Sequence, residues 1–391
     1  MKFLKRCWAE ISLENIRYNL TQYKKLIPEG AELMCVVKAS CYGHGDGLIA
    51  PFLQEELGVK YFAVSNILEG ERLRSEGIDG DILILGYTPP EYADELVKYD
   101  IIQACTELSY AEELSRSCTC GKVRIHAAVD TGMTRIGFYG MAEEICGEIA
   151  AVGQLENILL EGIFTHYACA DGCDPSEEEY TRCQTEKFNA VYDGLTKRGV
   201  KLIHSHSLNS AGGAYGFNDR STLVRLGIIL YGLYPDPKKP LPFEPRPVMT
   251  LKSSVSQVKY IEPGTCVSYG RTFTADRKMK LATVTAGYAD GYPRALSNKG
   301  EVIIGGKRCR ILGRVCMDQF MCDVSGLSDV KAGDEVILMN GEITADDIAG
   351  MIGTIGYEVT CGITERVPRT ASQSRTASQP RTASQSRTVT E

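Results

Sequence analysis

The stretch VVKASCYGHG (36–45) decides which fold the sequence predicts. It opens with residues that favour a β-strand, passes through Lys38 and continues into a turn that contains two glycines. An unpaired ammonium group is costly to bury, so a lysine at the end of an apolar strand is neutralised, paired or used covalently. From its position alone, Lys38 could form an ion pair with Asp130 or a Schiff base.

Working outward from this stretch, seven further apolar runs repeat the pattern. The first run, which contains Lys38, is MCVVKA (34–39). The seven further runs are YFAVSN (61–66), DILILG (81–86), IIQACT (101–106), VRIHAAVD (123–130), LLEGIFTH (159–166), LIHSHSLNS (202–210) and TLVRLGIILYG (222–232). Amphipathic stretches such as PPEYADELVKY (89–99) separate the runs. Continuous apolar strands that alternate with helices predict a parallel sheet covered by helices. Eight such units favour an α/β fold, a (β/α)8 TIM barrel, over a doubly wound open sheet.

The character of the sequence changes after a proline-rich linker (234–249). Short alternating segments separated by Gly and Pro predict a mostly antiparallel β domain. We therefore expect a barrel over 10–238 and a β domain over 239–368, which the N-terminal strand 1–9 joins. Residues 369–386 repeat RTASQS or RTASQP, and the whole segment 369–391 has no apolar side chain large enough to build a core, which predicts a disordered tail.

Composition argues against several classes of protein. The apolar fraction of 43% and the charged fraction of 24% are typical of a soluble globular chain. The net charge of −7 argues against nucleic acid or an anionic membrane as the main partner. No apolar run approaches the ~20 residues that span a bilayer, and the start lacks a signal peptide, so we expect a cytoplasmic protein. The 15 cysteines mostly stand alone in apolar segments, which predicts reduced thiols and no metal site.

Polar and ionisable residues gather at the carboxyl ends of the predicted strands, where barrel active sites assemble. They are Lys38, Asp130, His166, Asn209 and Ser210. The loops after strands seven and eight are the usual phosphate site of a barrel, and Ser210 and Gly227 lie there. A lysine that faces a phosphate site suits pyridoxal phosphate, although an ordinary loop serine and a packing glycine explain Ser210 and Gly227 equally well on their own.

Arg225 lies inside an apolar run just before Gly227. A buried arginine keeps its charge and needs an acceptor. The acceptor is either a carboxylate or the pyridine nitrogen of the cofactor.

Eight motifs resemble those of bacterial alanine racemases, in that family's order. They are VVKASCYGHG, VDTGMTRIGF (129–138), GIFTHYACAD (162–171), LNS (208–210), VRLGIILYG (224–232), VSYGRTF (267–273), GYADGYPR (287–294) and GRVCMDQFMCDV (313–324). The resemblance extends up to RVPR (366–369). It implies a pyridoxal-phosphate-dependent isomerase of fold type III that interconverts L- and D-alanine, a peptidoglycan precursor. It also implies a homodimer with composite active sites.

The resemblance implies a role for each matching residue. Lys38 resembles the Schiff-base lysine, which is also the base on the D side, and Tyr269 resembles the opposing base, which the partner subunit supplies. Arg225 resembles the partner of the pyridine nitrogen, and His166 resembles the histidine that links Arg225 with the tyrosine. The implied cofactor-binding residues are Lys38, Tyr42, His166, Asn209, Ser210, Arg225, Gly227 and Ile228. The implied substrate-binding residues are Arg135 and, from the second subunit, Tyr288 and Met317.

The chain departs from the family pattern at two positions of interest. Ala128 stands where many members carry a lysine that positions the arginine corresponding to Arg135. Glu365 aligns with a tyrosine that closes the pocket in some members.

Three other functions stay open at this point. A serine racemase of the vancomycin-resistance type resembles the chain closely, and Glu365 would favour a substrate with a hydroxyl group. A non-catalytic pyridoxal-phosphate-binding barrel would need no second base, and a decarboxylase of the same two-domain plan would use other residues opposite the lysine. Only a racemase needs Tyr269 as a base.

Overall fold

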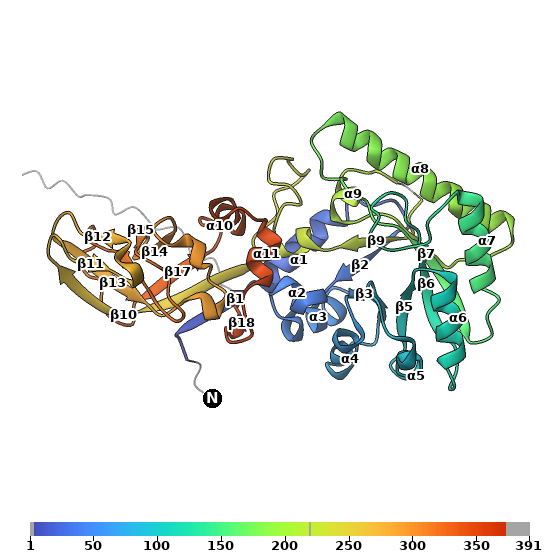
Figure 1. Cartoon of the computed structure of the whole chain (residues 1–391), viewed down its shortest axis with the longest axis horizontal. Coiled ribbons are helices and arrows are strands. Elements are labelled where there is room, and N and C mark those ends of the chain that lie inside the picture. The colour runs from blue at the N-terminus through green and yellow to red at the C-terminus, as the bar shows by residue number, and fades with distance from the viewer. Residues whose placement is uncertain (1–3, 219, 373–391) are drawn as a thin grey trace, which may run out of the picture.

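Two lobes make up the structure, one built on parallel strands and one on a mostly antiparallel sheet (Figure 1). The computed structural model describes residues 4–218 and 220–372. Among the helices of these residues, none is both long enough and apolar enough to cross a bilayer.

All eight predicted runs form strands of the first lobe. These are β2 (Glu32–Val36), β3 (Tyr61–Val64), β4 (Asp81–Ile84), β5 (Ile101–Cys105), β6 (Val123–Ala128), β7 (Ile158–Phe164), β8 (His204–His206) and β9 (Leu223–Leu226). Neighbouring strands pair in parallel in the order β8-β7-β6-β5-β4-β3-β2-β9. Hydrogen bonds from Thr222 N to Ser205 O (2.8 Å) and from Arg225 N to Leu208 O (3.0 Å) bring the two ends of the sheet together. The predicted TIM-like barrel is confirmed.

Helices surround the barrel strands (Figure 1). They are α1 (Leu13–Tyr23), α2 (Lys38–Tyr42), α3 (Asp46–Glu55), α4 (Ile67–Ser75), α5 (Ala93–Lys98), α6 (Leu108–Ser117), α7 (Ala142–Val152), α8 (Pro175–Lys197) and α9 (Ser210–Ala214), with the 3-10 turns η1 (Pro90–Tyr92) and η2 (Ile228–Tyr231). The longest, α8, begins with a capping box, because Asp174 Oδ1 accepts a hydrogen bond from Ser176 N and Glu177 Oε2 accepts one from Asp174 N.

The second lobe is the predicted β domain. Its large sheet contains β1 (Cys7–Ile11), β10 (Met249–Ile261), β13 (Met279–Val284), β14 (Glu301–Ile304), β15 (Lys307–Leu312), β16 (Phe320–Asp323), β17 (Glu335–Met339) and β18 (Arg369–Ala371). A small ribbon, β11 (Cys266–Val267) with β12 (Phe273–Thr274), and the turns η3 (Tyr269–Arg271), η4 (Tyr288–Asp290) and η5 (Arg294–Leu296) complete it. All strand pairs of the large sheet are antiparallel except β1 with β18, so the expected architecture is confirmed.

The structure differs from the sequence-based expectation near the C-terminal end. The helices α10 (Ala345–Ile352) and α11 (Gly356–Cys361) lie in the domain that was expected to be mostly antiparallel β structure, and neither helix was predicted. Residues 369–371, which were expected to start the disordered tail, instead form β18 beside residues 9–11, where their backbone gains hydrogen-bond partners. The rest of the predicted tail, 373–391, lies outside the described residues. The domain limits 10–238 and 239–368 stay a proposal.

Candidate active site

Lys38 follows the end of β2 and opens a left-handed turn. Residues 39–42 all have φ between 51° and 55°. A left-handed conformation costs a non-glycine residue roughly 1–2 kcal/mol, so the turn needs support from its surroundings. Glu69 accepts a hydrogen bond from Ala39 N (2.8 Å), and Gly45 N donates to Ser40 O (2.8 Å). The turn places Lys38 and Tyr42 on the wall of one cavity.

All residues predicted to bind the cofactor line this first cavity, which is open to solvent. They are Lys38, Tyr42, His166, Asn209, Ser210, Arg225, Gly227 and Ile228. The loop after β8 is shaped by Asn209, which caps α9 by accepting a hydrogen bond from Gly212 N (2.8 Å). Ser210 Oγ accepts one from Gly227 N (2.8 Å).

Gly227 and Tyr42 lie unusually close together. A Cβ atom added to Gly227 would lie 2.8 Å from the Tyr42 hydroxyl oxygen. That hydroxyl makes no hydrogen bond to any described residue. A small polar concavity with the hydroxyls of a tyrosine and a serine suits a phosphate group.

Arg225 is buried, with 2% of its surface exposed, and its partners are neutral. Its guanidinium donates to His206 Nδ1 (2.8 Å), Thr165 O (2.6 Å) and His166 Nδ1 (3.2 Å). Desolvation lowers the pKa of Arg225 to about 10, so the group stays cationic at neutral pH. The sequence left two possible acceptors for Arg225, a carboxylate or the ring nitrogen of a cofactor. No carboxylate among the described residues pairs with Arg225. Arg225 can therefore donate to a neutral ring nitrogen.

The contact with Arg225 fixes the tautomer of His166. Because Arg225 donates to His166 Nδ1, that nitrogen is the acceptor and Nε2 carries the proton of a neutral ring. Burial, followed by the charge of Arg225, holds the pKa of His166 well below its usual value. His166 is thus a neutral link between Arg225 and the cavity.

Arg135 lines a second cavity, which adjoins the first and shares Lys38, Tyr42 and His166 with it. Ala128 lines the same cavity and offers no side chain to anchor Arg135. The loop that carries Arg135 is held instead at its start. Asp130 Oδ1 accepts hydrogen bonds from Gly132 N (2.9 Å) and Thr134 N (3.0 Å).

Lys38 does not form the ion pair with Asp130 that its position allowed. The Asp130 carboxylate binds the amides of its own loop, and no described carboxylate pairs with Lys38. Desolvation, followed by the charge of Arg135, lowers the pKa of Lys38. A lowered pKa raises the fraction of neutral amine, which is the form that acts as a nucleophile or a base.

The three residues assigned to the second subunit lie elsewhere. Tyr269, Tyr288 and Met317 line neither cavity and are 74%, 42% and 53% exposed. They are nevertheless connected to one another through the β domain. Tyr288 N donates to Cys316 O (3.1 Å), and Ser268 Oγ, next to Tyr269, donates to Arg314 O (2.8 Å).

Helix α11, whose Tyr357 and Cys361 line the site, was not predicted from the sequence. Tyr357 lies on both cavities, and its ring centroid is 6.2 Å from that of Tyr42. Glu365, which was aligned with a pocket-closing tyrosine, is exposed and lines neither cavity. A signal was available, because Thr344 and Asp347 form a capping box that opens the preceding helix.

The donor set of the first cavity fits pyridoxal phosphate. The hydroxyls of Tyr42 and Ser210 suit the phosphate, Arg225 suits the ring nitrogen and Lys38 supplies an amine. Each of the 15 cysteines is a free thiol. Within residues 4–218 and 220–372, no cluster of three or more His, Cys, Asp or Glu side chains could hold a metal ion.

Comparison with known proteins identifies the family. Residues 11–235 match the alanine racemase N-terminal domain, and residues 248–371 match the alanine racemase C-terminal domain. The chain is 43% identical to alanine racemase 1 of Clostridium acetobutylicum over 94% of this chain and 96% of that one. Among solved structures it is similar to alanine racemase of Clostridium difficile (41% identity, TM-score 0.88, covering 94% and 96% of the two chains). It is also similar to alanine racemase of Bacillus anthracis with bound L-Ala-P (32%, TM-score 0.89, covering 96% and 97%). The chain therefore belongs to the alanine racemase family, the isomerases that interconvert L- and D-alanine with pyridoxal phosphate.

Proposed function

We propose that this chain interconverts L- and D-alanine with pyridoxal phosphate bound in the first cavity. The observation that carries the proposal is that three features line one cavity: Lys38 with its lowered pKa, the polar concavity at Ser210 that suits a phosphate group, and the buried, cationic Arg225. When bound, the cofactor supplies an electron-withdrawing ring that makes the α-proton of an amino acid removable.

The residues of the first cavity hold and tune the cofactor. The hydroxyls of Tyr42 and of Ser210, which the Gly227 amide holds, would bind its phosphate, and the Lys38 amine would link covalently to its aldehyde carbon with loss of water. Arg225 donates a hydrogen bond to the ring nitrogen and keeps that nitrogen unprotonated, because the guanidinium does not give up its proton near neutral pH. Arg135, on the adjoining cavity, faces the carboxylate of the substrate.

Two bases move the α-proton, one on each face of the substrate. Once the amino group of the substrate has taken the place of Lys38 on the cofactor, the released Lys38 Nζ would take or return the proton on the D side, and its lowered pKa increases the amount of neutral amine available for this step. The Tyr269 hydroxyl oxygen of the second subunit does the same on the L side. Two bases are required because inversion removes a proton from one face and returns one to the other.

The active site is composite, and the chain acts as a homodimer. Tyr269, Tyr288 and Met317 are exposed and lie outside both cavities of their own chain, so a second copy is needed to bring such residues over Lys38. The two chains then exchange these residues, and the interface is required for activity.

Alanine is the proposed substrate, because the one residue that favoured serine, Glu365, does not line the site. Glu365 was the residue that would favour a hydroxyl-bearing substrate, and it lines neither cavity. A cofactor carrier without turnover would have no use for Tyr269, and the matched family extends over both domains.

The test is a chiral assay of the purified protein loaded with cofactor. L-Alanine and L-serine are supplied separately over a range of concentrations, and the D-isomers are quantified by chiral separation. We expect kcat/KM to be clearly higher for alanine, and the Lys38→Ala variant to form no D-isomer. A higher value for serine would refute the substrate, and no D-isomer from either would refute racemisation.

A further inference from the structure

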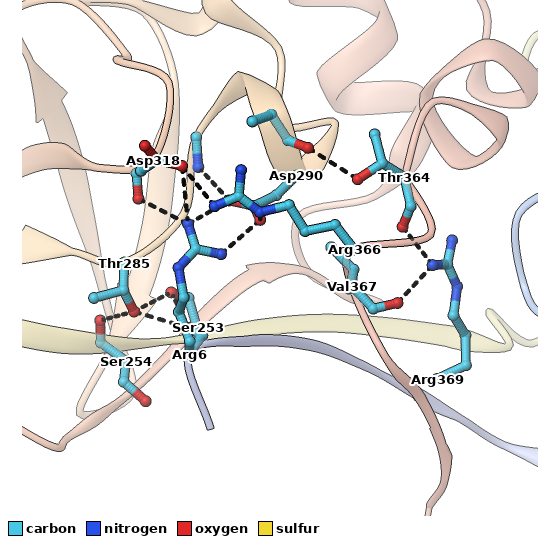
Figure 2. A network of polar contacts seen from close by, with 12 residues as sticks. Arg6, Ser253, Ser254, Thr285, Asp290, Asp318, Thr364, Arg366, Val367 and Arg369 are labelled. Atoms are coloured by element: carbon cyan, nitrogen blue, oxygen red, sulfur yellow. Dashed lines mark hydrogen bonds and ion pairs between the residues drawn. The ribbon is translucent and has the colours of Figure 1, made fainter. Parts of the chain in front are cut away.

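The two arginines of RVPR (366–369) reach toward different parts of the molecule (Figure 2). Arg366 points into the β domain, where it contacts Asp290 and Asp318. Arg369 points to the barrel, where it contacts Gly43. Neither arginine lines the cavities of the site.

Arg366 belongs to a network around a buried carboxylate. Asp290 is 1% exposed and pairs with Arg366 Nε (3.1 Å) and, through both oxygens, with Arg6 (2.6 and 3.0 Å). Its Oδ2 also accepts a hydrogen bond from Gly287 N (2.9 Å). Arg366 Nη2 donates to Asp318 Oδ1 (2.5 Å). Two arginines and two aspartates thus balance their charges, and a buried carboxylate without these partners would be strongly unfavourable.

This network holds the two segments that present Tyr288 and Met317. Asp290 ends the turn that begins at Tyr288, and Asp318 follows Met317 directly. The backbone joins the segments as well, because Ala289 N donates to Met317 O (3.0 Å). Arg366 and Arg6 each contact both aspartates, and together they fix the position of one segment relative to the other.

Arg369 supports the turn that begins at Lys38. Its Nε and Nη2 both donate to Gly43 O (3.0 and 2.8 Å), and its Nη1 donates to Thr364 O (2.6 Å). Gly43 caps the left-handed turn of residues 39–42 and packs so tightly on α11 that an added Cβ would lie 2.0 Å from Thr360 O. Arg369 thus ties the strained turn of Lys38 and Tyr42 to the end of the β domain.

We propose that Arg366 and Arg369 are positioning residues that serve different active sites of the dimer. Arg369 positions Lys38 and Tyr42 in the chain's own site, and Arg366 positions Tyr288 and Met317, which the chain donates to its partner. The inference rests on the proposed function, since it uses the composite site described there. Lysine cannot replace either arginine, because one ammonium group does not reproduce the planar set of donors that contacts several acceptors at once.

Hydrogen–deuterium exchange of the cofactor-loaded protein tests the two supports separately from activity. We expect Arg366→Lys to raise amide exchange in 287–291 and 316–319, and Arg369→Lys to raise it in 39–45. The matched control is Arg277→Lys, which changes an exposed ion pair with Asp323 in the same β domain and should leave both regions unchanged. Either variant loosening both regions equally, or neither variant loosening any, would overturn the inference.

Mixed dimers test which site each arginine serves. A Lys38→Ala chain paired with a Tyr269→Phe chain has one complete site, built from the barrel of the Tyr269→Phe chain and the β domain of the Lys38→Ala chain. Arg366→Lys should raise KM for alanine by about 10- to 100-fold when placed on the Lys38→Ala chain and have little effect on the other. Arg369→Lys should weaken cofactor binding and activity only when placed on the Tyr269→Phe chain.

The outcomes of this test distinguish failure of the inference about the arginines from failure of the proposed composite site. Equal loss with either placement would overturn the inference and indicate a general loss of stability. If the mixed dimer without arginine changes is inactive, the composite site itself fails, and the exchange experiment alone then decides whether the arginines hold the two segments.

Discussion

Replacing Gly227 with alanine probes the phosphate end of the first cavity. The new Cβ would lie 2.8 Å from the Tyr42 hydroxyl oxygen and 3.6 Å from Ser210 Oγ. The Tyr42 hydroxyl therefore has to move by roughly half an ångström to reach ordinary van der Waals separation. Its ring is packed between Tyr231 and Tyr357, with centroids 5.0 and 6.2 Å away, so the hydroxyl cannot shift without disturbing its neighbours.

The expected cost is the loss of one hydrogen bond to a charged phosphate. Such a bond contributes about 1.5–3 kcal/mol, which corresponds to cofactor binding that is about 10- to 150-fold weaker. The assay is titration of the apoprotein with pyridoxal phosphate, followed by absorbance. The matched control is Gly147→Ala in α7, where nothing lies within 4 Å of the added Cβ, so cofactor affinity should not change. Unchanged affinity in Gly227→Ala would refute the placement of the phosphate.

Three further predictions concern bases and pH. Tyr269→Phe should slow α-proton exchange from L-alanine by about 100-fold or more and from D-alanine much less, as followed by NMR in deuterated water; equal losses would contradict a one-sided base. Arg135→Gln removes a charge that lowers the pKa of Lys38, so the pH at which the apoprotein takes up cofactor at half its maximal rate should rise, and Arg135→Lys should not shift it. Burial lowers the pKa of all five histidines, to about 4 at His44 and about 3 at His126. In the unfolded chain these groups take up protons near pH 6.5, so stability should be complete above that pH and fall below it, by about 1.4 kcal/mol per pH unit for each fully buried histidine. Urea unfolding at about pH 7.5 and pH 5 measures this, and an unchanged midpoint would contradict it.

The barrel could be predicted because its signal is local. Each strand is a short apolar run, and the residues at its carboxyl end must meet at one face of the barrel whatever the details of the loops. A shared site could therefore be predicted before any contact was known, and one cavity is indeed lined by Lys38, His166, Asn209 and Arg225.

The parts that could not be predicted depend on long-range contacts. The left-handed turn after Lys38 contains no glycine in residues 39–42, so its composition does not indicate positive φ angles. Support from Glu69 and from Arg369, which bonds the Gly43 carbonyl across the chain, stabilises it. Tyr357 was missed for a similar reason, because α11 reaches the cavity only when the end of the β domain folds back onto the barrel.

The structure also explains why RVPR belongs to the folded region. Alignment with the repeat made residue 369 look like the first residue of the tail. Its side chain, however, makes hydrogen bonds to the backbone at Gly43 and Thr364, and its backbone pairs with Ala9. Arg369 therefore belongs to the folded region through both its side chain and its backbone.

The most direct test of the central claim is the activity of a purified mixed dimer. Chains carrying Lys38→Ala and Tyr269→Phe are given different affinity tags, co-expressed and isolated as the doubly tagged species. Each variant alone should be nearly inactive in the conversion of L- to D-alanine. The mixed dimer contains one complete site of two and should recover about half of the wild-type activity. A mixed dimer as inactive as its parents would show that Lys38 and Tyr269 do not meet across a subunit interface, and the two-base composite site would have to be abandoned.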